Sequence, residues 1–134
     1  DNLPISNHKE PQMAKKILVI DDDELVTQTV RNLLNRKGYE TTVINNGEDA
    51  IQSASKNDFD LILCDIRMPR KNGIETIREI RKVLEARNKP SIPSFFFTGY
   101  AEDQAFTDAQ AMGEVLLKPY DIHELFKLVE KYIK

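Results

Sequence analysis

The chain has 134 residues, of which 40% are hydrophobic and 31% are charged, and its formal net charge at pH 7 is −3. These values are ordinary for a soluble globular protein with one domain, and no apolar run approaches the ~18–20 residues that a membrane-spanning helix needs. Acidic and basic residues are interspersed, so we expect neither direct nucleic-acid binding nor membrane association. The single cysteine, Cys64, cannot form an internal disulfide, which favours a reducing, cytoplasmic location.

The first 14 residues differ in composition from the remainder. Residues 1–14 contain two prolines and show no hydrophobic periodicity, so we expect a flexible N-terminal tail or linker there. Two origins stay open for this segment: a fragment cut from a longer protein, or a natural start at Met13 preceded by added residues. Residues 15–134 are expected to form one folded domain.

From Lys16 onward, short apolar runs alternate with segments of helical periodicity. Short runs rich in β-branched and aromatic residues predict strands at 17–20, 41–44, 59–64, 94–97 and 115–117. Apolar residues at helical spacing predict helices at 24–37, 48–56, 74–86, 103–112 and 122–133. Strands and helices that alternate in this way form parallel βαβ units with right-handed crossovers. The sequence therefore predicts a flavodoxin-like (βα)5 fold, with one doubly wound parallel sheet in the order 2-1-3-4-5.

The residues that follow the predicted strands are the candidates for a functional site, because ligands bind to open parallel sheets at the carboxyl ends of the strands. These positions carry polar or charged side chains after four of the five strands: Asp21, Asp22 and Asp23; Asp65; Thr98 with Gly99; and Lys118 with Pro119. Since these strand ends meet at one edge of the sheet, we expect carboxylates, a hydroxyl and an ammonium group to converge there.

Carboxylates brought this close repel one another, so either one is protonated or a cation is bound between them. All-oxygen ligation without a nearby His or Cys suits a hard cation, Mg²⁺ before Ca²⁺ or Mn²⁺. A carboxylate beside such a metal can attack phosphorus and form an acyl phosphate. Lys118 would then neutralise the phosphoryl oxygens, and the Thr98 hydroxyl would donate a hydrogen bond to one of them.

Each of these features has a structural explanation when it is taken alone. A run of Asp after a strand is often a helix N-cap with favourable first-turn acids, and a single Asp at a strand end is usually a turn former. Their joint occurrence at four strand ends favours a site. Cys64 and Met68 are interpreted as buried packing residues, and neither His8 nor His123 is a good catalytic candidate.

The segment from Lys16 to the C-terminus resembles the receiver (REC) domain of two-component response regulators and hybrid histidine kinases. The resemblance is carried by four motifs: Ile20-Asp21-Asp22, Asp65-x-Arg67-Met68-Pro69 followed by Gly73, Thr98-Gly99, and Lys118-Pro119.

The resemblance implies a role for each of these residues. Asp65 would accept a phosphoryl group from a phosphohistidine on a sensor histidine kinase or a histidine phosphotransfer protein. Mg²⁺, or Mn²⁺, would be bound by Asp65, by Asp22 directly, by Asp21 mainly through water, and by the backbone carbonyl of Arg67. Thr98, Gly99 and Lys118 would surround the phosphoryl group, and the bond between Lys118 and Pro119 is expected to be cis.

The resemblance also implies how the domain would act. It would catalyse its own phosphorylation and slow dephosphorylation without turning over a separate substrate, and so would not be an enzyme. Phosphorylation would switch the face formed by the fourth helix, fifth strand and fifth helix, and phosphorylation-dependent self-association is among the expectations.

Two departures from the family pattern, and two further side chains near the site, bear on how this domain would act. Receivers commonly carry Tyr or Phe three residues before the lysine, whereas this chain has Val115, which puts an aromatic rotamer switch there in doubt. The connection before the fifth strand also looks about two residues shorter than is usual in receivers, by the spacing of the motifs. Arg67 and Tyr100, two residues after Asp65 and Thr98, would flank the path of an attacking water and slow dephosphorylation.

Two other classes of function stay open at this point. In a Mg²⁺-dependent phosphohydrolase, Asp21 and Asp23 would be the nucleophile and its partner two residues on, but the Asp65 motif would go unexplained. An interaction module that is not phosphorylated would usually have lost Asp65, the acidic pair or Lys118, all of which are present.

Overall fold

The computed structural model describes residues 14–99 and 104–133. Its elements follow one another in strict alternation of strand and helix: β1 (Lys16–Ile20), α1 (Glu24–Arg36), β2 (Glu40–Ile44), α2 (Gly47–Lys56), β3 (Leu61–Asp65), α3 (Gly73–Ala86), β4 (Ser94–Thr98), α4 (Gln104–Gln110), β5 (Glu114–Leu117) and α5 (Ile122–Tyr132). The five strands form one sheet in the order β2-β1-β3-β4-β5, and every neighbouring pair is parallel. The predicted doubly wound, flavodoxin-like fold is confirmed.

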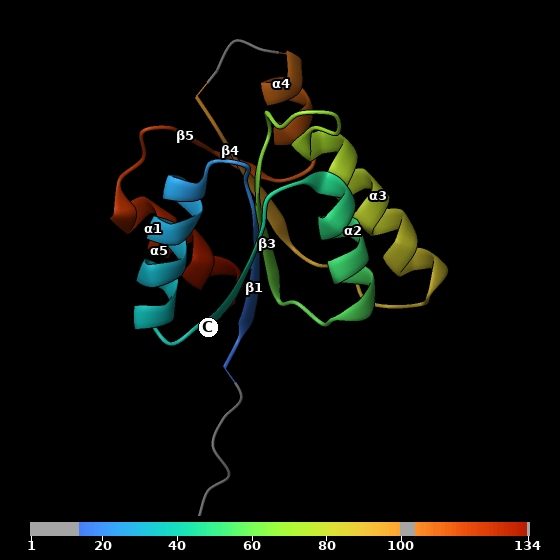
Figure 1. Ribbon diagram of the computed structural model, residues 1–134, viewed down its shortest axis with the longest axis horizontal. Coiled ribbons are helices and arrows are strands. Elements are labelled where there is room, and N and C mark those ends of the chain that lie inside the picture. The colour runs from blue at the N-terminus through green and yellow to red at the C-terminus, as the bar shows by residue number, and fades with distance from the viewer. Residues whose placement is uncertain (1–13, 100–103, 134) are drawn as a thin grey trace, which may run out of the picture.

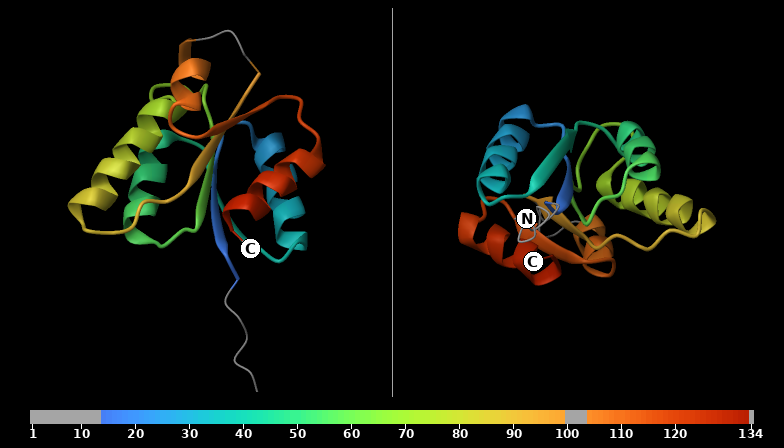
Figure 2. Two further views of the ribbon diagram at one scale, coloured as in Figure 1. Left: turned by 180° about the vertical axis from the view of Figure 1, so that it is seen from behind. Right: turned by 90° about the horizontal axis from the view of Figure 1, so that it is seen from below.

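The helices form two layers that cover both faces of the sheet. Figure 1 shows α1 and α5 on one side and α2 and α3 on the other, and the view from below in Figure 2 shows the sheet between them. Right-handed crossovers require a switch of side where the strand order reverses, between β1 and β3. The site is expected at that switch point, at the carboxyl ends of these strands.

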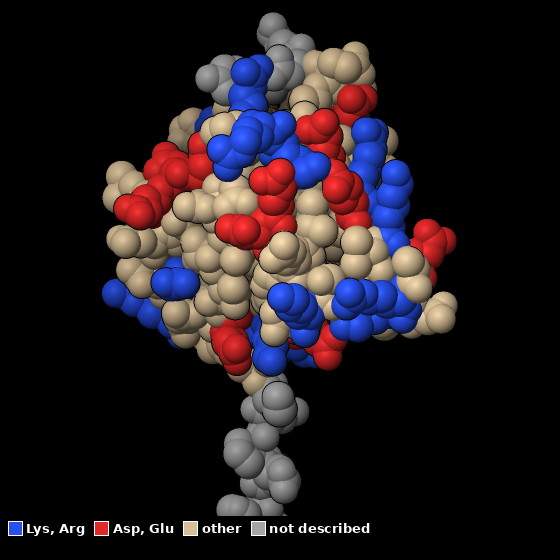
Figure 3. All heavy atoms as spheres, turned by 45° about the vertical axis from the view of Figure 1, so that its right-hand side comes forward, with Lys and Arg blue, Asp and Glu red and all other residues tan. Residues whose placement is uncertain are grey.

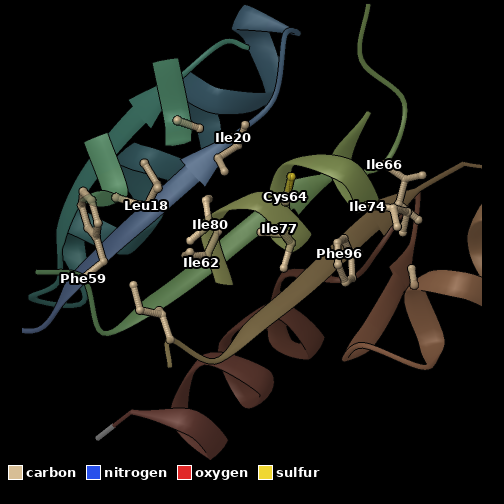
Figure 4. Packing of buried hydrophobic residues seen from close by; sticks show 14 of the residues in the cluster. Leu18, Ile20, Phe59, Ile62, Cys64, Ile66, Ile74, Ile77, Ile80 and Phe96 are labelled. Carbon is tan, nitrogen blue, oxygen red and sulfur yellow. The ribbon is translucent and has the colours of Figure 1, made fainter. Parts of the chain in front are cut away.

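The side chains of each central strand alternate between two cores, because successive residues of a strand point to opposite faces of the sheet. Leu18, Ile62 and Phe96 pack with α2 and α3 in the first core, part of which Figure 4 shows. Ile17 and Phe97 belong to the second core, which is shared with α1 and α5. This burial on both faces explains why the strands read as continuous apolar runs.

Cys64 and Met68 lie in the first core, as expected of packing residues. The predicted strand boundaries differ from the structure by at most one residue, except at the start of β3, and α4 ends at Gln110 rather than at the predicted Met112. The apolar pattern extended the third strand back to Phe59, whereas β3 starts at Leu61. Phe59 is buried in the first core from the preceding loop, so its hydrophobicity reflects packing rather than strand pairing.

The surface carries charges of both signs. Figure 3 shows acidic and basic side chains interspersed over the face that it presents. No helix within the described ranges is both long and apolar enough to cross a membrane.

Candidate functional site

Three charged side chains meet at the carboxyl edge of the sheet. Asp21 directly follows β1, Asp65 is the last residue of β3, and Lys118 directly follows β5. The ammonium group of Lys118 donates hydrogen bonds to Asp21 Oδ2 and to Asp65 Oδ1, both at 3.3 Å. Asp21 is only 1% exposed and Asp65 only 6% exposed. The structure thus brings residues 53 and 97 positions apart from Lys118 into one buried ionic cluster.

A third carboxylate lies beside these two. Asp21, Asp22 and Asp65 can each offer one oxygen such that the three oxygens lie within 4.8 Å of one another. Asp22 is exposed, which leaves a side open for water ligands and for an incoming substrate. Oxygen donors at this spacing, with water access, are what Mg²⁺ prefers, so the residues present fit the predicted metal.

The electrostatics of the cluster favour binding of a further cation. Burial, reinforced by the nearby charge of Asp21 and only partly offset by Lys118, raises the pKa of Asp65 to about 6. Burial also raises the pKa of Asp21. Although burial alone would lower the pKa of Lys118, the two carboxylates outweigh it and raise this pKa overall. One ammonium group therefore does not fully compensate the buried acids, and a divalent cation would remove the remaining penalty.

The third acid of the Asp run has a different task. Asp23 is the N-cap of α1, and its Oδ1 accepts hydrogen bonds from the backbone N–H groups of Leu25 at 3.0 Å and Val26 at 3.3 Å. The backbone N–H of Asp23 donates to Asp21 Oδ1 at 3.0 Å. The helix-cap interpretation of the Asp run thus holds for Asp23, whereas Asp21 and Asp22 belong to the acidic cluster.

The start of α3 is packed directly against the strand end that carries Asp65. The N–H of Gly73 donates to the carbonyl of Ile66 at 2.8 Å, and a Cβ on Gly73 would lie only 2.2 Å from the carbonyl oxygen of Asp65. Asn72 caps the helix in a reciprocal capping box with Glu75. The glycine in the Asp65 motif is therefore required by a close approach of two backbones.

The remaining predicted phosphoryl-binding residues lie at the same edge. Thr98 is the buried last residue of β4, and its carbonyl accepts a hydrogen bond from the N–H of Lys118 at 2.7 Å. A Cβ on Gly99 would meet no atom of the described residues within 4 Å. The bond between Lys118 and Pro119 is cis, as expected.

The predicted switch positions are less closely tied to the acidic cluster. Val115 is half-buried in β5 and packs against the first core. The side chain of Arg67 is exposed, and the role of its carbonyl as a metal ligand stays a prediction. Tyr100 lies outside the described residues, so the expectation for it stays a prediction too.

Two aromatic rings that the sequence analysis did not single out lie beside Lys118. The Lys118 ammonium nitrogen is 5.9 Å from the centroid of the Phe97 ring, and this ring is stacked on Tyr120 at 5.5 Å between centroids. The available sequence signal was their position: Phe97 precedes Thr98, and Tyr120 follows Lys118 and Pro119.

An apolar groove of about 420 Å³ opens between α1 and the segment after β5. Its lining includes Leu25, Val26 and Leu33 from α1 and reaches Lys118 and Tyr120. Leu25 is 75% exposed, which is unusual for a large apolar side chain. An exposed apolar side chain beside an apolar groove is typical of a surface that binds a partner.

The sequence profile of the response regulator receiver domain matches residues 17–130, which include all of these site residues. The chain belongs to the response regulator receiver domain family. It is thus a receiver domain of the kind found in two-component response regulators, in a family of signalling phosphoacceptors.

Curated relatives resemble the chain over part of their length. The transcriptional regulatory protein ZraR of Klebsiella oxytoca is 38% identical over 111 residues, which are 81% of this chain and 24% of the relative. The CpxR homolog of Haemophilus influenzae is 32% identical over 121 residues, 89% of this chain and 50% of the relative. The chain therefore spans about a quarter to a half of these relatives.

Solved structures share the whole fold. A two-component response regulator from Clostridium difficile has a TM-score of 0.79 at 29% identity, with coverage of 89% of this chain and 95% of the other. The response regulator TrrA of Thermotoga maritima, in complex with Mg²⁺ and BeF, has a TM-score of 0.76 at 29% identity and coverage of 89% and 99%. Receiver domain structures with Mg²⁺ thus occur among its relatives.

Proposed function

We propose that this receiver domain accepts a phosphoryl group on Asp65 in a Mg²⁺-dependent reaction, and that its donor is a phosphohistidine of a sensor histidine kinase or histidine phosphotransfer protein. The observation that carries the proposal is the placement of Lys118, whose ammonium group lies 3.3 Å from both Asp65 and Asp21. A nucleophile, a metal-binding carboxylate and a cation for the phosphoryl oxygens are then within reach of one phosphorus atom.

The chemistry is a single transfer between two partners. An oxygen of the ionised Asp65 carboxylate attacks phosphorus, the bond from phosphorus to the imidazole nitrogen breaks, and its electron pair stays on that nitrogen. Mg²⁺, bound at Asp21, Asp22 and Asp65, would neutralise the carboxylates and the phosphoryl oxygens. The pKa of Asp65 is raised to about 6 but still lies below neutral pH, so most of this carboxylate is ionised and able to attack.

Lys118 and Thr98 would connect phosphorylation to a change of shape. The phosphoryl group adds about 1.5 to 2 negative charges and three acceptor oxygens at Asp65. Lys118 would bind one of these oxygens and Thr98 another, which would draw the end of β4 inward and move α4, β5 and α5. A bias of a few kcal/mol is enough to make a minor conformation the major one.

The apolar groove along α1 supports a protein as the phosphodonor. It extends from the exposed Leu25 to Lys118, so a partner whose apolar side chains filled it would lie next to the acidic cluster. A small phosphodonor would not need this surface, whereas a protein donor would gain binding free energy there.

The direct test is incubation with Mg²⁺ and acetyl phosphate, followed by intact-mass measurement. We expect a gain of one phosphoryl group in the wild-type protein, none in Asp65→Asn, and none when Mg²⁺ is removed with a chelator. An unchanged mass in the wild-type protein, or the same gain in Asp65→Asn, would contradict the proposal.

A second assay, turnover of a generic phosphate ester, separates this function from that of a phosphohydrolase. A hydrolase that used Asp21 and Asp23 would turn over a generic phosphate ester and would lose that activity in Asp21→Asn but not in Asp65→Asn. The geometry argues against it, because the Asp23 side chain is engaged with the first turn of α1. We therefore expect no ester turnover in either variant or in the wild-type protein.

A further inference from the structure

The ammonium group of Lys118 lies between two carboxylates and one aromatic ring. It lies 5.9 Å from the centroid of the Phe97 ring, within the distance at which a cation is attracted to an aromatic face. Phe97 is fully buried, and Tyr120 stacks on it with an angle of only 13° between the ring planes. Phe97, directly before Thr98, and Tyr120, two residues after Lys118, thus contact each other next to the site.

We propose that Phe97, held by Tyr120, is a positioning residue that fixes the Lys118 ammonium group at the place where phosphoryl oxygens are bound. This inference deepens the proposed function and rests on it. It assigns no chemical step to either ring, since neither touches the reacting atoms.

The physical argument begins with the flexibility of lysine. A lysine side chain has four rotatable bonds, and fixing it in one conformation costs up to about 2 kcal/mol of rotamer entropy. An ammonium group has three N–H donors, and here two of them are directed to Asp21 and Asp65. Because the carboxylates lie on the same side as the incoming group, a surface is needed to support the ammonium group from another direction.

The Phe97 ring provides that support in two ways. Its negative face attracts the cation, and its bulk excludes water that would otherwise compete for the ammonium donors. The stack on Tyr120 limits tilting of the ring, and the hydrogen bond from Lys118 N–H to the Thr98 carbonyl, at 2.7 Å, holds the two chain segments together. The ammonium group is therefore placed before the phosphoryl group arrives, so less ordering is required on binding.

The same strand supplies a matched control in Phe95. Phe95 and Phe97 are both fully buried and both belong to the second core. The Phe95 ring is stacked on Tyr132, 6.2 Å between centroids, and meets the Phe97 ring edge-on at 6.4 Å. Replacement of either ring by leucine removes similar packing, but only Phe97 lies under Lys118.

The experiment compares Phe97→Leu with Phe95→Leu in the full chain. Beryllofluoride affinity at saturating Mg²⁺ measures binding of a phosphoryl-like group. We expect Phe97→Leu to weaken it about two- to fivefold, the effect of a lost cation–π contact, while Phe95→Leu stays at the wild-type value. NMR of the Lys118 Cε protons gives a second readout, since the ring-current shift from Phe97 should disappear only in Phe97→Leu.

Equal loss of affinity in both variants would assign the effect to general packing and overturn the inference, as would wild-type affinity in Phe97→Leu. If Phe97→Leu does not fold, Tyr120→Leu tests the same point at a half-buried position, with a smaller loss expected and wild-type affinity counting against the inference. If the wild-type protein itself neither binds beryllofluoride nor becomes phosphorylated, the proposed function fails instead.

Discussion

The two central strand ends of the site, those of β3 and β4, differ in how firmly the chain around them is held. After β3, the backbone of α3 approaches so closely that a Cβ on Gly73 would lie 2.2 Å from the carbonyl oxygen of Asp65. After β4, a Cβ on Gly99 would meet none of the described atoms within 4 Å. The two glycines that follow these strand ends thus lie in opposite surroundings: Gly73 is crowded by backbone atoms, whereas the space at Gly99 is open among the described residues.

The helices that follow these strands show the same contrast. Helix α3 has 14 residues, a capping box and six buried residues. Helix α4 has seven residues, and Ala109 is the one buried residue in it. Because local stability follows buried apolar contacts and satisfied helix ends, α3 should hold Asp65 rigidly while α4 moves at low cost. Within the proposed function, a fixed phosphoacceptor is thus paired with an adjustable element that can respond to it.

The largest effect is expected from filling the crowded glycine position. Gly73→Ala would force the Asp65 carbonyl and the start of α3 apart, since neither backbone can move without disturbing β3. We expect a loss of at least about 3 kcal/mol in the free energy of unfolding, as for severe overpacking. Urea denaturation at fixed pH, with the slope compared between variants, measures this loss.

The matched control is Gly99→Ala at the open position. Alanine there also restricts the unfolded chain and adds no contact with the described residues, so we expect a change within about 1 kcal/mol of the wild-type value. Similar losses in the two variants would contradict the contrast between the strand ends.

The second effect concerns the charge held at the rigid end of β3. Burial, with the charge of Asp21, raises the pKa of Asp65 from 3.8 to about 6, so the folded state binds a proton more tightly than the unfolded state does. Stability from this group is therefore complete below pH 3.8 and is lost as the pH rises to about 6. Without Mg²⁺ at pH 7.5, we expect Asp65→Asn to be more stable than the wild-type protein by about 2 kcal/mol.

This gain should shrink as the pH is lowered through that window, and saturating Mg²⁺ should reverse it, because the metal binds and stabilises the folded wild-type protein. Thermal unfolding at several pH values, with and without Mg²⁺, measures both trends. Asp58→Asn is the control, since it removes a carboxylate whose side chain is 94% exposed, and we expect it to show neither trend. An Asp65→Asn variant that is less stable without Mg²⁺ would refute the electrostatic account of the site.

The sequence was sufficient for the fold and for most of the site, and its failures have physical reasons. Alternating apolar runs and the residues after them located Asp21, Asp65 and Lys118, because in a parallel sheet the strand ends share one edge. Which acid of the Asp run caps α1 depends on backbone angles that a run of identical residues does not reveal. The Phe97–Tyr120 stack joins two segments that are far apart in the sequence, and hydrophobic periodicity predicts helices and strands but not which distant side chains contact each other.

The smallest effect on global stability, and the most local one, is expected on the side of α4. The Nη2 group of Arg81, in α3, donates to the carbonyl of Met112 at 2.9 Å, just beyond the end of α4. Helix α4 has no basic residue in its last turn, so this cation from α3 is well placed to stabilise the negative end of the helix.

Arg81→Ala would remove this contact along with a buried Nε that has no hydrogen-bond partner among the described residues, so the two changes partly cancel. We expect a global loss of about 1 kcal/mol or less, the value of one net hydrogen bond. Hydrogen exchange should nevertheless become faster in α4 and the 111–113 connection and stay unchanged in α3, because α4 opens independently of the core. Lys82→Ala, at an exposed neighbouring position, should change neither. Faster exchange spread evenly over α3 and α4 would mean that the two helices open as one unit, and the contrast between the strand ends would then not extend to their dynamics.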